Sequence, residues 1–525
     1  MLQRFVFLFS IVISLAGVGC DESDVKRPFC SVNRVGPYAQ NMPYVGVHGG
    51  PANNDYIPCV SSDRYAVAWH QLKGLAIGQP NTFSPDGRTL YVTTSQPTED
   101  ACNVWALDTV TGDDLWCRRV PGDAIWSAIE VDSDGVLYLT TELGILSLTA
   151  AGEQRWATEI ARVEADGRSD GAVGLHFTPN GEIATVTNLG VVTLVSRATG
   201  AVITRLDIPA EFGWELPPPA EQGTLTRLLP DEVLMDFNGL QFGGPSRLLN
   251  TFSGEGNFSD NTAAVAPDGR IYVIGGDSFD GALFQINVDR SGPEPKLVSG
   301  WHLKTKGSSA TSPAVSPDGQ QVKVSDGNGT LGLLDPLNAG AKTYLANIAE
   351  CDANEDSNPD ATICAPSVTI PLLSGPAMGT TPMLNEGVHY HYEIQVSDLL
   401  NTDTPDLRAF SGGSLLWEIR LPDDLQWTSV ITVTENHLIG TATRFTASGE
   451  SILGIVELPE TADSDLLVLN RQTGEIVFRH PISDDSTSTV SVGPDGSLYV
   501  TMLCLMHTFA LETRPVGGLI RFIPD

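Results

Sequence analysis

The segment between Cys351 and Cys364 carries the side chains best suited to hold a cation. Oxygen donors occupy alternate positions between the two cysteines: Asp352, Asn354, Asp356, Asn358 and Asp360. Carboxylate and amide oxygens are the ligands that calcium requires. An EF-hand is excluded, because Ser357 and Ile363 stand where it needs Gly and Glu. The sequence therefore predicts either a simpler calcium loop or a solvated acidic loop.

Other residues with chemical potential give weaker signals. His389-Tyr390-His391 would place two imidazoles on one face of a strand, where they could hold a metal. No third ligand is identifiable, so we expect a surface strand. Gly327–Gly332 matches a dinucleotide fingerprint, but it leads into a strand and lacks the helix that binds phosphate. Cys504 and His507 form only part of a haem-attachment pattern.

Eight cysteines in an exported chain indicate disulfides first. We expect three bonds, Cys30–Cys59, Cys102–Cys117 and Cys351–Cys364. Cys504 is then left over, as a buried apolar group inside a strand-like run.

Residues 1–19 are predicted to be a signal peptide. Arg4 precedes an apolar run that is too short to span a bilayer comfortably, and small residues follow it up to Cys20. This arrangement resembles the lipobox of bacterial lipoproteins and makes Cys20 the expected lipidation site, although Gly17 stands where that pattern usually has Leu. An ordinary cleavage site that releases a free secreted protein is the alternative. Residues 20–64 would form a lipid-anchored, disulfide-bounded segment.

Composition indicates an all-β protein. The 52 Gly and 34 Pro residues are spread along the chain at a density that helices would not tolerate. The formal net charge of −34 makes nucleic-acid binding unfavourable, because such a surface repels phosphate. Since no later stretch is long and apolar enough to span a bilayer, membrane contact is expected through the N-terminal lipid only.

Two sequence signals recur along the chain. The first is a turn containing Asp-Gly before an alternating strand, as at Ser84–Gly87 and Ser316–Gly319. The second is a strand, a turn with Gly, and a second strand with a large residue four positions after that Gly. Val104–Trp116 and Leu466–Phe478 are its clearest copies. Each pair of signals predicts a four-stranded unit built on β-hairpins.

Val104–Trp116 resembles the repeat of the pyrroloquinoline-quinone (PQQ)-like, quinoprotein alcohol dehydrogenase-type propellers, and Leu466–Phe478 matches it well. The resemblance implies a β-propeller over residues 65–525. It also implies that tryptophans of the outer strands dock against the neighbouring blade; the candidates are Trp69, Trp116, Trp156, Trp301 and Trp417.

Eight four-stranded blades are expected. Their first strands begin near residues 81, 124, 173, 259, 309, 377, 427 and 487, and a ninth weak copy lies in 224–252. The orphan strand Tyr65–Leu72 is expected to complete the last blade and close the ring. Insertions are placed at about 209–223, as an extended connection, at 351–364 and at 448–463.

The function expected from these features is that of a non-enzymatic lipoprotein of the cell envelope, facing the periplasm or the cell exterior. Its propeller would bind a protein or glycan partner, as in the BamB-type scaffold that it is similar to. No cofactor is expected, apart from calcium at the acidic loop. The alternative is a PQQ-dependent dehydrogenase of alcohols or sugars, although these enzymes commonly stack the quinone on adjacent cysteines, which this sequence lacks.

Overall fold

The computed structural model describes most of the chain from Val32 onward. The described residues are 32–95, 100–122, 124, 127–141, 143–160, 162–163, 169–217, 257–259, 261–277, 280–307, 311–326, 342–355, 363–371, 382–392, 406–452, 456–486, 488–503 and 516–525.

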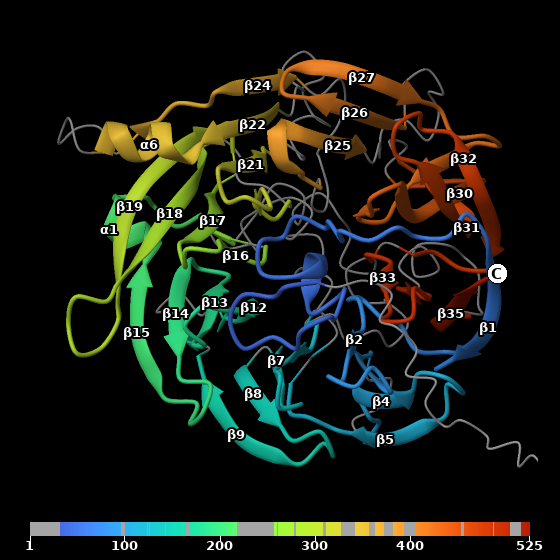
Figure 1. Cartoon of the computed structure of the whole chain (residues 1–525), viewed down its shortest axis with the longest axis horizontal. Helices are drawn as coiled ribbons and strands as arrows, with labels where there is room; N and C mark the ends of the chain where they lie inside the picture. The colour runs from blue at the N-terminus through green and yellow to red at the C-terminus, as the bar shows by residue number, and fades with distance from the viewer. Residues whose placement is uncertain are drawn as a thin grey trace, which may run out of the picture.

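The strands form eight blades around a central axis, and the all-β fold class is confirmed (Figure 1). The first three blades contain β2 (Thr82–Phe83), β3 (Thr89–Thr93), β4 (Val104–Asp108), β5 (Asp114–Arg118); β6 (Glu130–Val131), β7 (Leu137–Thr141), β8 (Gly144–Leu148), β9 (Gln154–Glu159); and β12 (Ala172–Phe177), β13 (Ile183–Thr187), β14 (Val191–Val195), β15 (Val202–Asp207). A small hairpin, β10 (Arg162–Val163) with β11 (Ser169–Asp170), joins the second and third blades.

The fourth to seventh blades follow the same order. They contain β16 (Ala264–Val265), β17 (Ile271–Gly276), β18 (Gly281–Asp289), β19 (Lys296–Thr305); β20 (Ala314–Val315), β21 (Gln321–Ser325), β22 (Lys342–Asn347), β24 (Val368–Pro371); β25 (Val388–Tyr392), β26 (Leu407–Ser411), β27 (Ser414–Ile419); and β28 (Leu425–Trp427), β29 (Thr432–Val433), β30 (His437–Ile452), β31 (Val456–Asn470), β32 (Ile476–Ile482). A 3-10 turn, η3 (Asn385–Gly387), precedes β25.

The eighth blade joins the two ends of the chain. It contains β33 (Ser491–Val492), β34 (Leu498–Met502) and β35 (Gly518–Pro524), and its outermost strand is β1 (Tyr65–Gln71). β1 pairs antiparallel with β35, from Tyr65 opposite Pro524 to Gln71 opposite Leu519. The predicted closure by an N-terminal strand is therefore confirmed.

Tryptophans of the outer strands fasten several blades to the next one. Four indole N–H groups donate to a backbone carbonyl in a turn of the following blade: Trp69 to Thr109 (3.3 Å), Trp116 to Ala150 (2.9 Å), Trp156 to Arg197 (3.2 Å) and Trp417 to Arg471 (3.1 Å). The turn also needs its Gly, because Gly112 has φ +76° and a Cβ there would lie 2.9 Å from the Trp69 ring. This pairing explains why Gly and Trp recur together in the sequence.

Two of the insertions take regular structure. Where we expected an extended connection after residue 209, a short helix α1 (Ile208–Phe212) begins, and the Asp207 side chain caps it by accepting from Ala210 N–H. The insertion at 448–463 lengthens the hairpin of β30 and β31, which pair from His437 opposite Asn470 to Ile452 opposite Val456. The weak ninth copy at 224–252 lies outside the described residues.

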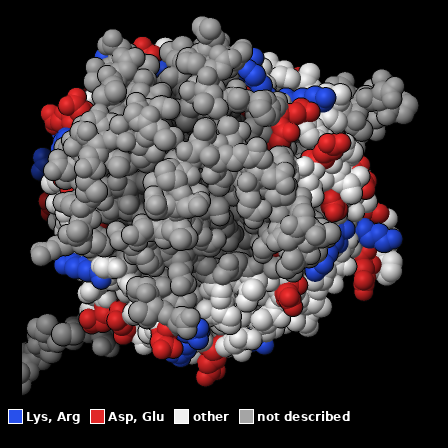
Figure 2. Space-filling model, turned by 180° about the vertical axis from the view of Figure 1, so that it is seen from behind, with Lys and Arg blue, Asp and Glu red and all other residues white. Residues whose placement is uncertain are grey.

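The surface charges and the hydropathy of the helices are those of a propeller with a polar rim. Figure 2 shows acidic and basic side chains interspersed around the visible rim of one face. Among the described residues, no helix is long and apolar enough to cross a membrane.

Candidate functional site at the propeller axis

Residues 32–64, here called the axial segment, run through the middle of the ring (Figure 1). The segment contains one 3-10 turn, η1 (Val47–Gly49), and otherwise lacks regular structure. Its aromatic residues Tyr38 and Tyr44 are each 1% exposed, so the blades enclose it. A propeller leaves a channel at its axis, and in this chain its own N-terminal part occupies that channel.

Main-chain hydrogen bonds attach the axial segment to the inner edge of blade after blade. They are Ser133 N–H to Pro37 O (2.7 Å), Val265 N–H to Pro51 O (2.6 Å), Val315 N–H to Ala52 O (2.8 Å), Met383 N–H to Asn54 O (3.3 Å), Val433 N–H to Asp55 O (2.8 Å) and Ile57 N–H to Val433 O (2.8 Å). Residues 51–55 thus contact the fourth, fifth, sixth and seventh blades in turn. The segment acts as a hub to which separate blades are bonded.

Two buried histidines strengthen this attachment. His176 of β12 bonds through Nδ1 to Glu130 of β6 and through Nε2 to Asn53 of the axial segment, both at 2.9 Å. All three side chains are at most 1% exposed. One imidazole therefore links two blades to the hub.

The second histidine, His48, belongs to the axial segment itself. Its Nδ1 lies 3.2 Å from Asp55 Oδ2, and its Nε2 lies 3.1 Å from Ser312 Oγ, next to β20. An acid, a histidine and a hydroxyl in this order also form the relay that activates a serine nucleophile. Here the three side chains are 0%, 7% and 5% exposed, and the bonds join the hub to the fifth blade. These three side chains therefore attach the axial segment to a blade, as the His176 group does.

Burial governs the electrostatics of these acids. It raises the pKa of Glu130, while His176 acts in the opposite direction. Burial likewise raises the pKa of Asp55, which His48 and then Lys323 offset. Burial disfavours the charged form of each carboxyl group, and the neighbouring basic side chains offset part of this cost.

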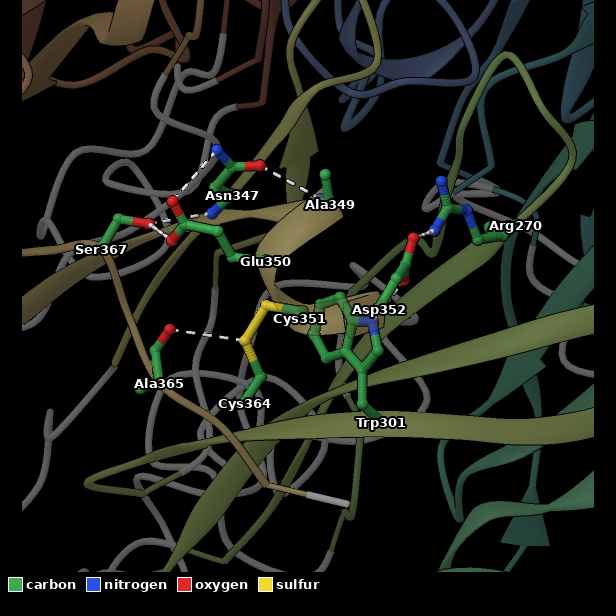
Figure 3. The surroundings of a disulfide bond; sticks show 10 residues. All are labelled: Arg270, Trp301, Asn347, Ala349, Glu350, Cys351, Asp352, Cys364, Ala365 and Ser367. Atoms are coloured by element: carbon green, nitrogen blue, oxygen red, sulfur yellow. Dashed lines mark hydrogen bonds and ion pairs between the residues drawn. A yellow bond between two sulfur atoms is a disulfide. The ribbon is translucent and has the colours of Figure 1, made fainter. Parts of the chain in front are cut away.

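The acidic insertion lies on the outside of the ring, between the fourth and fifth blades. Helix α6 (Ile348–Glu355) follows β22, at the place where other blades have their Gly turn. Trp301 of β19 docks here too, but its indole N–H donates to Asp352 Oδ1 (3.1 Å) instead of a turn carbonyl (Figure 3). Asp352 therefore takes over the structural role of the missing turn.

Asp352 has a cationic partner within the protein. Arg270 Nη1 lies 2.6 Å from Asp352 Oδ2, and Arg270 Nε lies 2.7 Å from Asp268 Oδ2. These residues line a hollow of about 190 Å³. The guanidinium stands between two carboxylates, where a bound cation would otherwise balance them.

The remaining calcium candidates are placed only in part. Asn354 lies in helix α6 and not in a loop, whereas Asp356, Asn358 and Asp360 lie outside the described residues. Within the described part of the chain, no three His, Cys, Asp or Glu side chains are grouped to hold a metal. Calcium binding by this insertion stays a prediction.

Two of the three expected disulfides are present, Cys102–Cys117 and Cys351–Cys364. The second bond connects α6 to β23 (Ile363–Cys364), which pairs parallel with β19 and adds a fifth strand to the fourth blade. Cys59 is also disulfide-bonded. Its expected partner Cys30 lies outside the described residues, as do Cys20, Cys504, His507 and the fingerprint from Gly327 to Gly332.

Replacing Cys351 and Cys364 together by Ser should lower the free energy of unfolding by about 2–4 kcal/mol. Without the bond, α6 loses its cross-link to β23, so amide exchange in both should accelerate. Urea unfolding and hydrogen exchange measure the two effects. The matched control replaces Cys102, just before β4, and Cys117 of β5, two strands that are already paired. It should leave exchange in α6 unchanged. Unchanged exchange in α6 in the first variant would contradict the assignment.

The expectation of a surface strand at His389 and His391 is wrong. These side chains are 0% and 2% exposed, because β25 packs between neighbouring blades and both of its faces are covered.

Comparison with known proteins supports the fold. No family model and no curated protein matches the sequence. Among solved structures, the quinohaemoprotein alcohol dehydrogenase from Comamonas testosteroni has a TM-score of 0.55 at 12% identity, over 91% of this chain and 80% of its own. Quinohaemoprotein alcohol dehydrogenase ADHIIG from Pseudomonas putida HK5 gives 0.54 at 12%, over 92% and 80%. BamB from Moraxella catarrhalis gives 0.46 at 11%, over 87% and 99%.

The chain has an eight-bladed β-propeller fold, and in this fold it is similar to these dehydrogenases. At these identities the likeness extends to the fold alone. The sequence predicts the blades of this propeller but not the hub formed by residues 32–64. The available signal was a set of tyrosines, Tyr38, Tyr44 and Tyr56, in a stretch without strand periodicity.

Proposed function

We propose that this chain is a non-enzymatic lipoprotein of the cell envelope, anchored through Cys20, whose propeller is a binding platform for a protein or glycan partner. The observation that carries the proposal is the filled axis. Main-chain bonds hold the axial segment where a propeller would otherwise offer a central channel to a ligand. Recognition of a large partner then falls to the rim and the outer strands.

One part of the outer surface suits such a partner. In β27, Leu415 and Leu416 are adjacent and are 49% and 54% exposed. β27 is also the outermost described strand of the sixth blade, and no other described strand pairs with its outer edge. An apolar, unpaired edge is a surface to which another chain can add.

The proposal is tested with a photo-crosslinking amino acid at Leu416 in the lipidated protein in its native membrane. Leu115 is the matched control, because it also precedes a docking tryptophan in an outer strand and is 51% exposed. We expect a discrete adduct from position 416 and none from 115. Replacing Cys20 by Ser should release the protein from the membrane fraction and remove the adduct. Equal labelling from both positions, or a Cys20→Ser protein that stays in the membrane, would overturn the proposal.

A titration with PQQ and calcium separates this function from that of a dehydrogenase. The platform should take up no quinone and reduce no dye when alcohols or sugars are added. Stoichiometric quinone binding with dye reduction would replace the proposal by the enzymatic one.

A further inference from the structure

The two faces of the ring differ in which turns they carry. Successive strands of a blade are antiparallel, so the turn from the first to the second strand and the turn from the third to the fourth lie on one face. We call this the entry face. Its turns from first to second strand include residues 84–87, 132–135, 178–181, 434–437 and 493–496. The turns from second to third strand lie on the opposite face.

The axial segment begins on the entry face. Ser133 N–H, in the turn of the second blade, donates to Pro37 O (2.7 Å). A Cβ on Gly36 would lie 2.8 Å from Thr178 O, in the corresponding turn of the third blade. Val32, which starts the segment, is therefore only a few residues away from both turns.

The axial segment also ends on the entry face, at the seventh blade. Glu435 N–H donates to Cys59 O (2.9 Å), and Ser61 N–H donates to Asn436 Oδ1 (2.9 Å). Glu435 and Asn436 form the turn between β29 and β30. The segment thus passes into the axis and returns to the face from which it entered.

The length of chain between the lipid site and the ring limits how the protein can be held. Eleven residues separate Cys20 from Val32, and a chain of this length spans at most about 40 Å. To place the lipid beneath the opposite face, the chain would have to pass the width of a four-stranded blade and the length of a five-residue strand. These two distances together are about 35 Å before turns and side chains are added. Lipid anchoring therefore brings the entry face, and not the opposite face, to the membrane.

Exposed apolar side chains occur on the entry face. Val35 and Val60 lie close to the points where the axial segment enters and leaves the axis and are 49% and 66% exposed, and Val110, in the turn from β4 to β5, is 70% exposed. Among the exposed large apolar residues of the described chain, Leu143 lies in a turn of the opposite face, and the others lie within strands. Apolar side chains next to a lipid anchor can enter the boundary between headgroups and acyl chains.

Charge attraction does not explain a membrane contact of the entry face. Asp134 and Glu435 are exposed there, as is Arg88. Anionic headgroups attract clusters of basic side chains and repel acidic ones. A contact made by this face must therefore depend on the lipid and on apolar side chains, and salt should not weaken it.

We propose that the entry face is the membrane-facing surface of this protein, where Val35, Val60 and Val110 contact the lipid in addition to the anchor. This inference rests on the proposed anchoring through Cys20 and identifies the surface that such an anchor presents to the bilayer. The opposite face and the outer strands, β27 among them, then stay accessible. A partner that adds to the edge of β27 would approach along the membrane surface.

The experiment uses the lipidated full chain in vesicles of phosphatidylcholine, with a fluorescent amino acid at one position at a time. Brominated acyl chains quench a fluorophore that reaches the membrane. Val60 and Val110 are the test positions, and Leu143 is the matched control because it is 52% exposed on the opposite face. We expect loss of fluorescence at positions 60 and 110, equal at low and high salt, and no loss at 143.

Two variants separate the face contact from the anchor. Val60→Asp combined with Val110→Asp changes two exposed side chains; it should stay on the vesicles through its lipid but reduce quenching of a fluorophore at position 35. Cys20→Ser should leave the vesicles. Equal quenching at 60, 110 and 143, or none at any of them in vesicle-bound protein, would overturn the membrane-facing surface and leave the anchor intact. Retention of Cys20→Ser on the vesicles would instead overturn the anchor, and the inference with it.

Discussion

A chain that begins at Ser61 should fail to form a stable propeller, whereas a chain that begins at Val32 should fold. The shorter chain keeps β1 and every blade but loses the axial segment. It loses main-chain hydrogen bonds to five blades, each contributing about 1 kcal/mol. It also exposes the cavity that Met42, Val45 and Ile57 fill, at about 2 kcal/mol for each side chain. Since a protein of this kind has a total stability of about 5–15 kcal/mol, the loss consumes most of it.

Thermal unfolding followed by near-ultraviolet circular dichroism measures this effect. A matched variant, Asn53→Ala in the longer chain, removes the contacts of Asn53 with His176 and Thr262 and places Ala at a positive φ of 50°. It should lower the melting temperature without abolishing the transition. If both chains melt at the same temperature, the axial segment is an occupant of the channel and not the hub of the fold.

Acid should destabilise the protein strongly between about pH 6.5 and pH 3, through the buried histidines His389 and His391 of β25. Burial lowers the pKa of His389 from 6.5 to about 3 in the folded state, so the unfolded chain binds the proton first. Stability is therefore complete above pH 6.5 and is lost as the pH falls, by about 1.4 kcal/mol per pH unit for each such group. The pKa of His391 is lowered in the same direction, so its contribution adds to the loss.

Urea unfolding at a series of pH values checks this expectation. His391→Phe keeps a ring beside Phe410 but cannot be protonated, so its slope over this range should be smaller than that of the wild type. His480→Gln should leave the slope unchanged. A slope in His391→Phe equal to that of the wild type would show that other groups govern acid unfolding.

The sequence predicts the ring well because each blade repeats a local pattern. A turn with Asp-Gly, alternating strands and a Gly four residues before a tryptophan are all short-range features. Gly112 and Trp116 illustrate them, and their structural partners lie in adjacent blades at matching positions. Because this pattern of turn, strands and Gly recurs in successive blades, the sequence predicts the blade number and the closure by β1.

The buried polar groups could not be predicted in the same way. The contact between His48 and Ser312 joins residues 264 positions apart and has no local signature. His389 and His391 alternate with Tyr390 and Tyr392, a pattern that predicts one solvated face. In an inner strand both faces are covered, so the alternation there does not report exposure. The structural role of Asp352 is not visible in the sequence either, because its partners Arg270 and Trp301 are distant from it along the chain.

The hub also determines when this protein can acquire its structure. Tyr65 pairs with Pro524 at the other end of the chain. Residues 51–55 form hydrogen bonds with blades that are synthesised hundreds of residues later. Contact order is therefore high, and neither the first blade nor the axial segment can reach its final environment until the last strand has been made. A polypeptide of this kind emerges with unpaired strands and apolar surfaces exposed, and these are prone to aggregate. Its maturation should therefore depend on a chaperone that holds the incomplete chain more than on the rate of any single blade.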